Sequence, residues 1–337
     1  MSRSPSPVRT GVAIVIGVVI AQALLVAFFS WSGASARPHQ VPVVVSGPAP
    51  VAAQVEGALT AAGPDAFAVT RVPDQATADR ALRDRRAYAA ILAGPDGLAL
   101  HVASAGSPAV AGALIEAAQR FGGGRPVPVT DVVPADPDDP HGAGFTLGFL
   151  PLAIASLAAG ALLARLVTSR LTRFVGLLGY ALVAGLASAA VLRSWLGILP
   201  GRYLAVAAAI GLFALAVAAA TAGLGAVAGA PGIGLAVLVV FLLGNPISGL
   251  ASAPELVPAP WGTIGQYLPV GAGGTVLRSD AFFAGVGANR QVVVLAVWAV
   301  VGLALAVLGR RGARATVERT DEDAVRGEVA PTAEVAG

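Results

Sequence analysis

Long apolar runs alternate with polar segments along this chain. Six of the runs approach the roughly 20 residues that an α-helix needs to cross about 30 Å of hydrocarbon. They cover residues 11–29, 145–166, 174–195, 203–228, 233–251 and 291–309. None of them contains an acidic residue, and arginines occur only near their ends. We therefore predict a membrane-embedded, all-α bundle of six transmembrane helices.

Residues 30–144, between the first two runs, follow a different pattern. Short apolar stretches of strand length alternate with segments of helical periodicity in the order βαβαββαβ. The third and fourth strands flank Pro95-Asp96-Gly97, a sequence typical of a hairpin turn. This order predicts an inserted α/β or α+β domain that is long enough to fold by itself.

Residues 252–290 separate the last two runs and are rich in proline and glycine. Trp261 and Tyr267 suit the headgroup level of a bilayer, because each ring has an apolar body and a polar group. We predict that this segment lies along the outer membrane interface or dips into it. The charged segment 310–337 is predicted to be a disordered cytoplasmic tail.

Arginines near the span ends predict the orientation in the membrane, since cytoplasmic loops carry the excess of positive charge. Two arginines, Arg193 and Arg202, flank the short loop between the third and fourth runs. The opposite side of the membrane has nine, which are Arg3, Arg9, Arg165, Arg170, Arg173, Arg310, Arg311, Arg314 and Arg319. Both termini, with residues 1–10 at the start, are therefore predicted to be cytoplasmic, and residues 30–144 and 252–290 extracellular.

The first run has a second interpretation. Arginines, an apolar stretch and then Ala34-Ser35-Ala36 are also the pattern of a cleavable signal peptide. Cleavage would leave five spans and an outer N-terminus. The apolar stretch 11–29 is longer than the roughly 7 to 15 residues of a signal peptide, so we predict a retained anchor.

The composition agrees with a membrane protein and excludes several chemistries. The chain is 56% hydrophobic and 12% charged, with a mean hydropathy of +0.76, whereas about a quarter of the residues of a soluble domain are charged. All 22 basic residues are arginine, and there is no cysteine. Without lysine or cysteine the chain lacks a Walker A lysine, a Schiff-base amine, thiol nucleophiles, disulfides and zinc-thiolate sites. The bias toward Arg, Ala, Gly and Val is typical of high-GC bacterial coding, which suggests a bacterial plasma membrane. The basic pI is better explained by arginines that orient the spans in the membrane than by binding to nucleic acid.

The fifth run is interrupted by Asn245-Pro246 in FLLGNPISG. The proline removes a backbone donor, and the asparagine carries an amide that lipid cannot satisfy. One interpretation is a helix stop or kink in which the amide caps the freed carbonyls. The other is a broken helix that lines a translocation path.

Other candidate motifs have simple structural interpretations. Gly144 with Gly148, and Gly225 with Gly229, have the spacing that allows helices to approach closely. The acidic run DPDDPHG, residues 136–142, is predicted to be a solvated linker, with a divalent-cation site as the weaker alternative. The histidines at 39 and 101 are isolated in the sequence. We predict no catalytic residue, cofactor or metal, and therefore no enzyme.

The layout and two sequence blocks resemble the ATP-binding-cassette type-2 permeases, in particular the phage-infection-protein-like branch. The first block is DVVPADPDDPHGAGFTLGFLPLA, residues 131–153, and the second is residues 244–283. The second block matches the family's G-N-P-x-S-G, L-P-x-G and L-R-S pattern through Gly244, Asn245, Pro246, Ser248, Gly249, Leu268, Pro269, Gly271, Leu277, Arg278 and Ser279.

This resemblance implies a permease half that forms a homo- or heterodimer in the lipid bilayer. A separate ATP-binding subunit would drive export of a lipid-like, polymeric or drug-like substrate. The loop after the second span, with Arg165, Arg170 and Arg173, would contact that ATPase. Asn245, Pro246, Trp261, Pro269 and Arg278 would mark the helix break and the outer segment. The rival hypothesis is a membrane-anchored extracellular binding or scaffolding protein without transport activity, in which the outer domain acts and the spans hold it.

Overall fold

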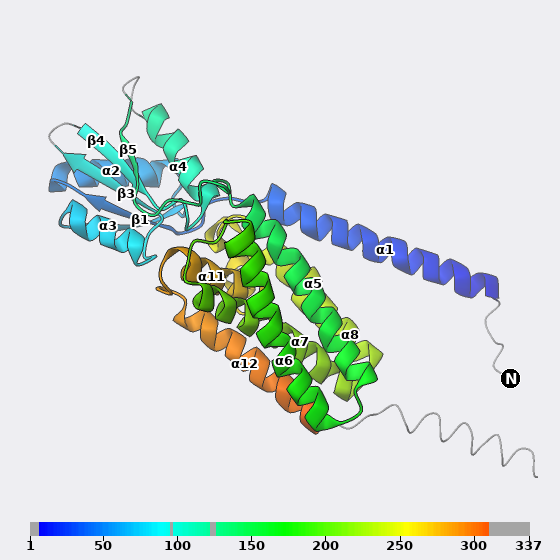
Figure 1. Ribbon diagram of the computed structural model, residues 1–337. Coiled ribbons are helices and arrows are strands. Elements are labelled where there is room, and N and C mark those ends of the chain that lie inside the picture. The colour runs from blue at the N-terminus through cyan, green and yellow to red at the C-terminus, as the bar shows by residue number, and fades with distance from the viewer. Residues whose placement is uncertain (1–6, 95–96, 122–125, 310–337) are drawn as a thin grey trace, which may run out of the picture.

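The computed structural model describes residues 7–94, 97–121 and 126–309. These residues form a sheet domain and a bundle of helices (Figure 1). Within these residues, six helices are long and apolar enough to cross a membrane. They are α1 (Pro7–Ala34), α5 (Ala143–Leu166), α6 with the π-helical η1 (Arg170–Ala189 and Ala190–Trp195), α7 (Tyr203–Ala228), α8 with η2 and α9 (Ala230–Val237, Leu238–Leu243 and Gly244–Ile247), and α12 (Asn289–Leu308). All six predicted spans are therefore helices. The predicted tail 310–337 lies outside the described residues.

The span boundaries shift where local capping decides them. The third helix begins at Arg170, earlier than the predicted 174, because the Ser169 hydroxyl accepts a hydrogen bond from Thr172 N at 3.3 Å and caps the helix. The fifth helix covers 230–247 and not 233–251. It begins directly after Gly229, whose φ of 65° provides the turn from α7.

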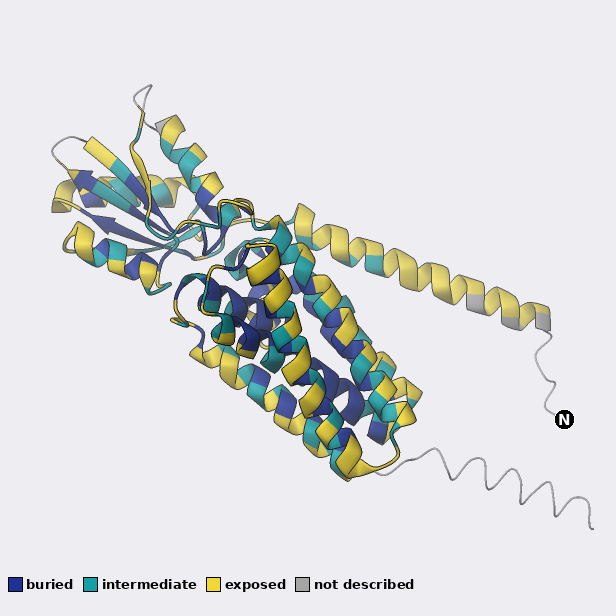
Figure 2. Ribbon diagram, in the orientation of Figure 1, coloured by how far each residue is buried: buried dark blue, intermediate teal, exposed yellow. Residues whose placement is uncertain are grey.

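Helix α7 is the centre of the bundle and packs against α5, α6, α11 (Pro269–Phe282) and α12. In its most apolar stretch 67% of the residues are buried, whereas in α1 none are. Figure 2 shows the outer helices buried toward the middle of the bundle and exposed on their outer faces. Most buried residues of α7 are alanines, so neighbouring backbones can approach closely.

Glycines set the closest contacts around α7. A Cβ built on Gly302 of α12 would lie 2.4 Å from the carbonyl carbon of Ala219. A Cβ on Gly185 of α6 would lie 2.4 Å from the carbonyl oxygen of Ala207. Both distances are too short for any side chain, so these positions bring backbone directly against backbone.

The glycine pairs predicted from spacing behave differently from one another. A Cβ on Gly148 would lie 3.2 Å from Leu192, and one on Gly225 would lie 3.0 Å from Ile233, so both pack against side chains. Gly144 lies at the start of α5, beside Asp139. Gly229 is a turn residue, and its predicted role in helix packing is wrong. Spacing alone does not distinguish a packing glycine from a turn glycine.

Helix α1 stands away from the bundle and is exposed along its apolar length (Figures 1 and 2). Its contact with the bundle is at its C-terminal end, where the Ser32 hydroxyl donates to the Pro246 carbonyl at 2.6 Å. An apolar helix with so little protein contact is suited to surrounding lipid.

The sheet domain, residues 41–131, follows the predicted order βαβαββαβ. Its elements are β1 (Val41–Ser46), α2 (Ala49–Ala62), β2 (Phe67–Val72), α3 (Gln75–Arg83), β3 (Ala89–Gly94), β4 (Gly97–Val102), α4 (Pro108–Phe121) and β5 (Val129–Asp131). The strands lie in the order β2-β1-β3-β4-β5, with β3 and β4 antiparallel and the other neighbours parallel. The predicted hairpin is therefore confirmed. The interior strand β1 is buried on both faces, as expected for a strand with parallel neighbours.

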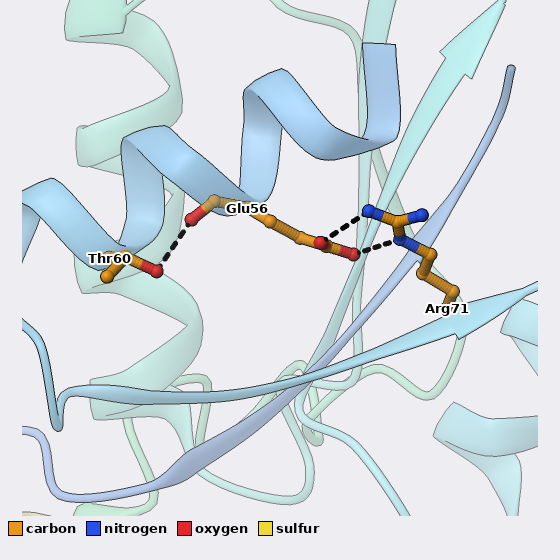
Figure 3. Close-up of polar contacts among 3 residues, drawn as sticks. All are labelled: Glu56, Thr60 and Arg71. Carbon is orange, nitrogen blue, oxygen red and sulfur yellow. Dashed lines mark hydrogen bonds and ion pairs between the residues drawn. The ribbon is translucent and has the colours of Figure 1, made fainter. Parts of the chain in front are cut away.

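A surface ion pair joins the first helix of the sheet domain to its edge strand (Figure 3). Arg71 of β2 donates through Nη2 to Oε2 of Glu56 on α2 at 2.7 Å, and through Nε to the other carboxylate oxygen. The hydrogen bond from Arg71 lowers the pKa of Glu56. Because both groups are exposed to solvent, this pair contributes little to stability.

The close contact at Gly302 gives a test of the bundle. Gly302→Ala is expected to lower the unfolding temperature of the detergent-purified protein, by an overpacking cost of about 1–3 kcal/mol. The matched control is Gly179→Ala on α6, where a Cβ meets nothing within 4 Å. There alanine should be neutral or stabilising by up to about 1 kcal/mol, because it favours helix more than glycine does. Equal unfolding temperatures for the two variants would contradict this packing of α12 on α7.

Candidate functional site

A cavity of about 440 Å³ lies where the sheet domain meets the chain that follows α9. We call it the junction cavity, and we call residues 248–282 the junction segment. Figure 1 shows the sheet domain at the end of the bundle, close to α11. Its charged and polar lining comes from both parts of the chain and consists of His39, Gln40, Arg85, Tyr88, Ser248, Glu255, Thr263, Gln266, Thr275, Arg278, Arg290 and Gln291.

The junction segment is a folded unit. It forms a 3₁₀ turn at Pro254–Leu256, helix α10 at Trp261–Gly265 and then α11. Pro269 occupies the first turn of α11, where a missing N–H costs nothing, and most of this helix is buried. Trp261 and Tyr267 remain partly exposed, with 41% and 52% of their surface accessible. Both aromatic rings are therefore accessible at the surface, and the interfacial position of this segment stays a prediction.

Arg278 of α11 is buried and joins three parts of the chain. Its Nη1 donates to the Gly106 carbonyl of the sheet domain at 3.2 Å, and its Nη2 donates to the Leu250 carbonyl at 3.0 Å. Its guanidinium also lies 4.7 Å from the ring centre of Phe145 on α5. The sequence motif included Arg278, but the partners of its guanidinium could not be predicted from the sequence.

Arg85 approaches the same cavity from the sheet domain. It follows α3 with a φ of 57°, an unusual backbone conformation that directs the chain toward the bundle. Its Nη1 donates to the Thr275 carbonyl at 3.1 Å, and its guanidinium lies 5.1 Å from the ring centre of Phe283. Our sequence analysis missed Arg85, because neighbouring arginines on the same polar segment carry no distinguishing signal.

Tyr88 and Glu255 form the second bridge across the junction. The Tyr88 hydroxyl donates to Oε2 of Glu255 at 2.8 Å. Beside it, the chain that leaves α1 bonds to the same turn, with Arg37 N donating to Leu256 O at 3.1 Å and His39 N donating to Glu255 O at 2.8 Å. The entry to the sheet domain is thus tied to the junction segment by backbone bonds as well as by side chains.

Polar side chains hold the bundle side of the cavity in place. Gln266 donates through Nε2 to the Ser248 carbonyl at 2.8 Å, and its Oε1 accepts from the Thr275 hydroxyl at 2.7 Å. Because both ends of the amide are bonded, its orientation is determined.

The cavity is electropositive. Arg85, Arg278 and Arg290 line it together with a single carboxylate, that of Glu255. Burial, and to a lesser extent the nearby charge of Arg85, lower the pKa of Arg278 to about 10. Burial also lowers the pKa of Arg85, against the opposing effects of Tyr88 and Glu255. Arginine stays protonated in proteins, so both groups are cations at neutral pH.

The helix break lies beside this cavity, and the helix ends close to Asn245 and Pro246, as the first interpretation predicted, whereas the translocation path stays a prediction. The regular helix gives way earlier, to the π-helical turn Leu238–Leu243, and the helical path ends at Ile247. The cap is made by Ser248, whose N and Oγ donate to the Asn245 carbonyl at 3.3 and 2.7 Å. The predicted cap by the asparagine amide is therefore replaced by a serine cap.

The predicted ATPase-contact arginines divide into two groups. Arg165 and Arg170 are exposed at the end of the bundle away from the sheet domain. Arg173 is buried and donates to the Ala306 carbonyl at 2.9 Å and to the Val167 carbonyl at 2.8 Å. The prediction that Arg173 faces a partner is thus wrong for this structure, because its guanidinium ties α6 to the end of α12.

The acidic run before α5 is a structural cap. Asp139 is buried, and its carboxylate accepts from Gly144 N at 3.0 Å and from Phe145 N at 2.8 Å. A carboxylate at this point stabilises the unpaired donors and the positive end of the helix. The prediction of a solvated linker is wrong at Asp139. In the described ranges, no group of three potential metal ligands is found.

His39 and His101, which the sequence left isolated, both have a polar partner in the structure. Nδ1 of His101 lies 2.6 Å from the Asp79 carboxylate inside the sheet domain. Nδ1 of His39 lies 2.7 Å from the Arg37 carbonyl. The sequence distance between His101 and Asp79 hid a contact that the sheet creates.

Comparison of the chain with protein-family models, with curated proteins and with solved structures finds no match.

The bridging role of Arg278 can be tested by Arg278→Leu. This change removes two hydrogen bonds and leaves two buried carbonyls without that donor, at a cost of about 1–3 kcal/mol each. We expect faster protease cleavage between the sheet domain and the bundle, and a lower unfolding temperature. Arg290→Leu is the matched control, because Arg290 is exposed and its contact in the structure is with the Tyr267 ring. Equal protease sensitivity of the two variants would show that Arg278 does not hold the junction.

Proposed function

We propose that this protein is the membrane subunit of an ATP-binding-cassette exporter in a bacterial plasma membrane. It would span the bilayer six times with both termini in the cytoplasm, and the sheet domain and junction segment would lie outside. It would act as a dimer and move its substrate with energy from a separate ATPase.

One observation carries this proposal. The block that resembles the type-2 permeases, residues 244–283, forms the bundle side of the junction cavity through Ser248, Glu255, Gln266, Thr275 and Arg278. Of the residues that carry the resemblance, Ser248, Gly249, Gly271 and Arg278 therefore meet at one cavity. A cavity where two parts of a chain meet, lined by apolar side chains and a few polar groups, is a common place for a small-molecule site.

The energy source is inferred from what the sequence contains. The six predicted spans contain no acidic residue, and intramembrane carboxylates are the usual proton and sodium relays of ion-driven carriers. The chain also contains no lysine for a Walker A loop. A partner that hydrolyses ATP is the source that fits both facts.

A second candidate is a membrane-anchored binding or scaffolding protein. It is favoured by one feature, a hydrophobic cluster formed by sheet-domain residues alone, whose buried members are Ala89, Leu100, Val102 and Ala111. The two candidates differ in whether ATP hydrolysis is needed. Activity that persists in cells depleted of every copurifying ATPase would favour the scaffold.

The exposed arginines Arg165 and Arg170 provide the test of partner binding. We expect Arg165→Glu with Arg170→Glu to reduce copurification of an ATPase at least about tenfold, since each reversal places like charges in a charge-complementary interface. The measurement is quantitative mass spectrometry of the tagged full chain from its native membrane.

Arg202→Glu is the matched control, because Arg202 is also exposed but precedes α7 at the opposite end of the bundle. It should leave copurification unchanged. If no ATPase copurifies with the unmodified chain, or if the double variant retains it fully, the exporter proposal or its contact loop is rejected.

A further inference from the structure

We propose that the junction cavity binds the phosphate group of an organic ligand through the guanidinium groups of Arg85 and Arg278. As a statement about the transported molecule, this inference rests on the proposed function. As a statement about a binding site, it rests on the cavity alone.

The charges of the described residues that line the cavity are unbalanced. Three guanidinium groups and one carboxylate line the cavity, and the carboxylate of Glu255 already accepts from the Tyr88 hydroxyl. The ion pairs within the described residues join other partners and include neither Arg85 nor Arg278. Buried charges are normally paired, so a cavity with surplus cations favours an anion.

Arg85 and Arg278 retain N–H donors for a ligand. Among the described residues, the hydrogen bonds of Arg85 and Arg278 use one and two of their nitrogens, respectively. A guanidinium has further N–H groups, in a planar fork that matches phosphate oxygens. Both side chains line the cavity, and their protein bonds hold the two forks in position before a ligand arrives.

The charges of Arg85 and Arg278 repel each other. The charge of Arg85 contributes to the lowered pKa of Arg278, which means that the two cations are close enough to disfavour each other. An anion that contacts both would relieve this repulsion. A phosphate, with several oxygens and up to two charges, can accept from both groups at once.

The volume identifies the size of the ligand. A cavity of about 440 Å³ falls in the range of about 300–1,000 Å³ typical of small-molecule sites and is much larger than a bare phosphate needs. Val257, Leu250 and Phe283 provide apolar surface beside the charged groups. The ligand class is therefore a phosphate ester, supplied either by a phospholipid headgroup or by a water-soluble metabolite.

The test measures binding to the purified full chain in neutral detergent, without any ATPase, through the shift in unfolding temperature with ligand concentration. Two matched pairs of probes differ only in the phosphate. Phosphatidic acid is compared with diacylglycerol, and glycerol 3-phosphate is compared with glycerol at equal ionic strength. We expect at least one phosphate probe to stabilise the protein more than its phosphate-free partner. The pair that responds identifies the lipid or the soluble source.

Variants then locate the site. Arg85→Gln should weaken phosphate binding by about tenfold or more, and Glu255→Gln should strengthen it by several-fold, because the only carboxylate in the lining is removed. The controls are Arg71→Gln and Glu56→Gln, which neutralise the surface pair in Figure 3 outside the cavity and should change binding less than about twofold. If Arg85→Gln does not fold, the increase in Glu255→Gln alone decides.

The inference is overturned if neither phosphate probe exceeds its partner, or if binding is unaffected by both cavity variants. Its failure is separate from failure of the proposed function. If phosphate binds but no ATPase copurifies, the phosphate site is supported and the exporter proposal is rejected. If an ATPase copurifies but phosphate does not bind, the exporter proposal is supported and the phosphate site is rejected.

Discussion

The guanidinium of Arg278 holds the two halves of this protein together. It donates to a carbonyl of the sheet domain and to a carbonyl of the loop after α9, while its face lies over Phe145 of α5. A cation in such a place gives up much of its hydration, and the carbonyls and the ring replace only part of it. Arg278 therefore joins the two parts of the chain and also brings an uncompensated positive charge to the junction. The shape and the charge of the cavity both depend on the contacts of this side chain.

The bundle supplies a rigid base for this junction. Helix α7 is lined by alanines and approached by glycines of α6 and α12, so the surrounding helices pack at backbone contact. Close packing of this kind has little tolerance for added volume. Helix α11 also packs on α7, and it carries Thr275 and Arg278 into the lining of the cavity. The position of the polar site is in this way set by apolar contacts beneath it.

Part of the site could be predicted from the sequence, and the remainder could not. Arg278 and Pro269 were identified because residues 244–283 resemble the type-2 permeases, and Asn245 because an amide beside a proline interrupts an apolar run. Arg85, Tyr88 and Glu255 were missed, since each belongs to an ordinary helix, strand or loop sequence. They meet only because the sheet domain folds back on a segment more than 160 residues away in the chain, as the separation of 167 between Tyr88 and Glu255 records.

The sequence by itself determined the six apolar helices and the order of strands and helices in the sheet domain, because hydrophobic periodicity and turn residues act over short distances. Tertiary structure alone decided that Arg173 is buried, that Asp139 caps a helix, and that Gly229 makes a turn. It also decided which arginines gather at the junction cavity. Burial and charge proximity depend on how distant segments pack, and no local pattern of residues encodes that distance.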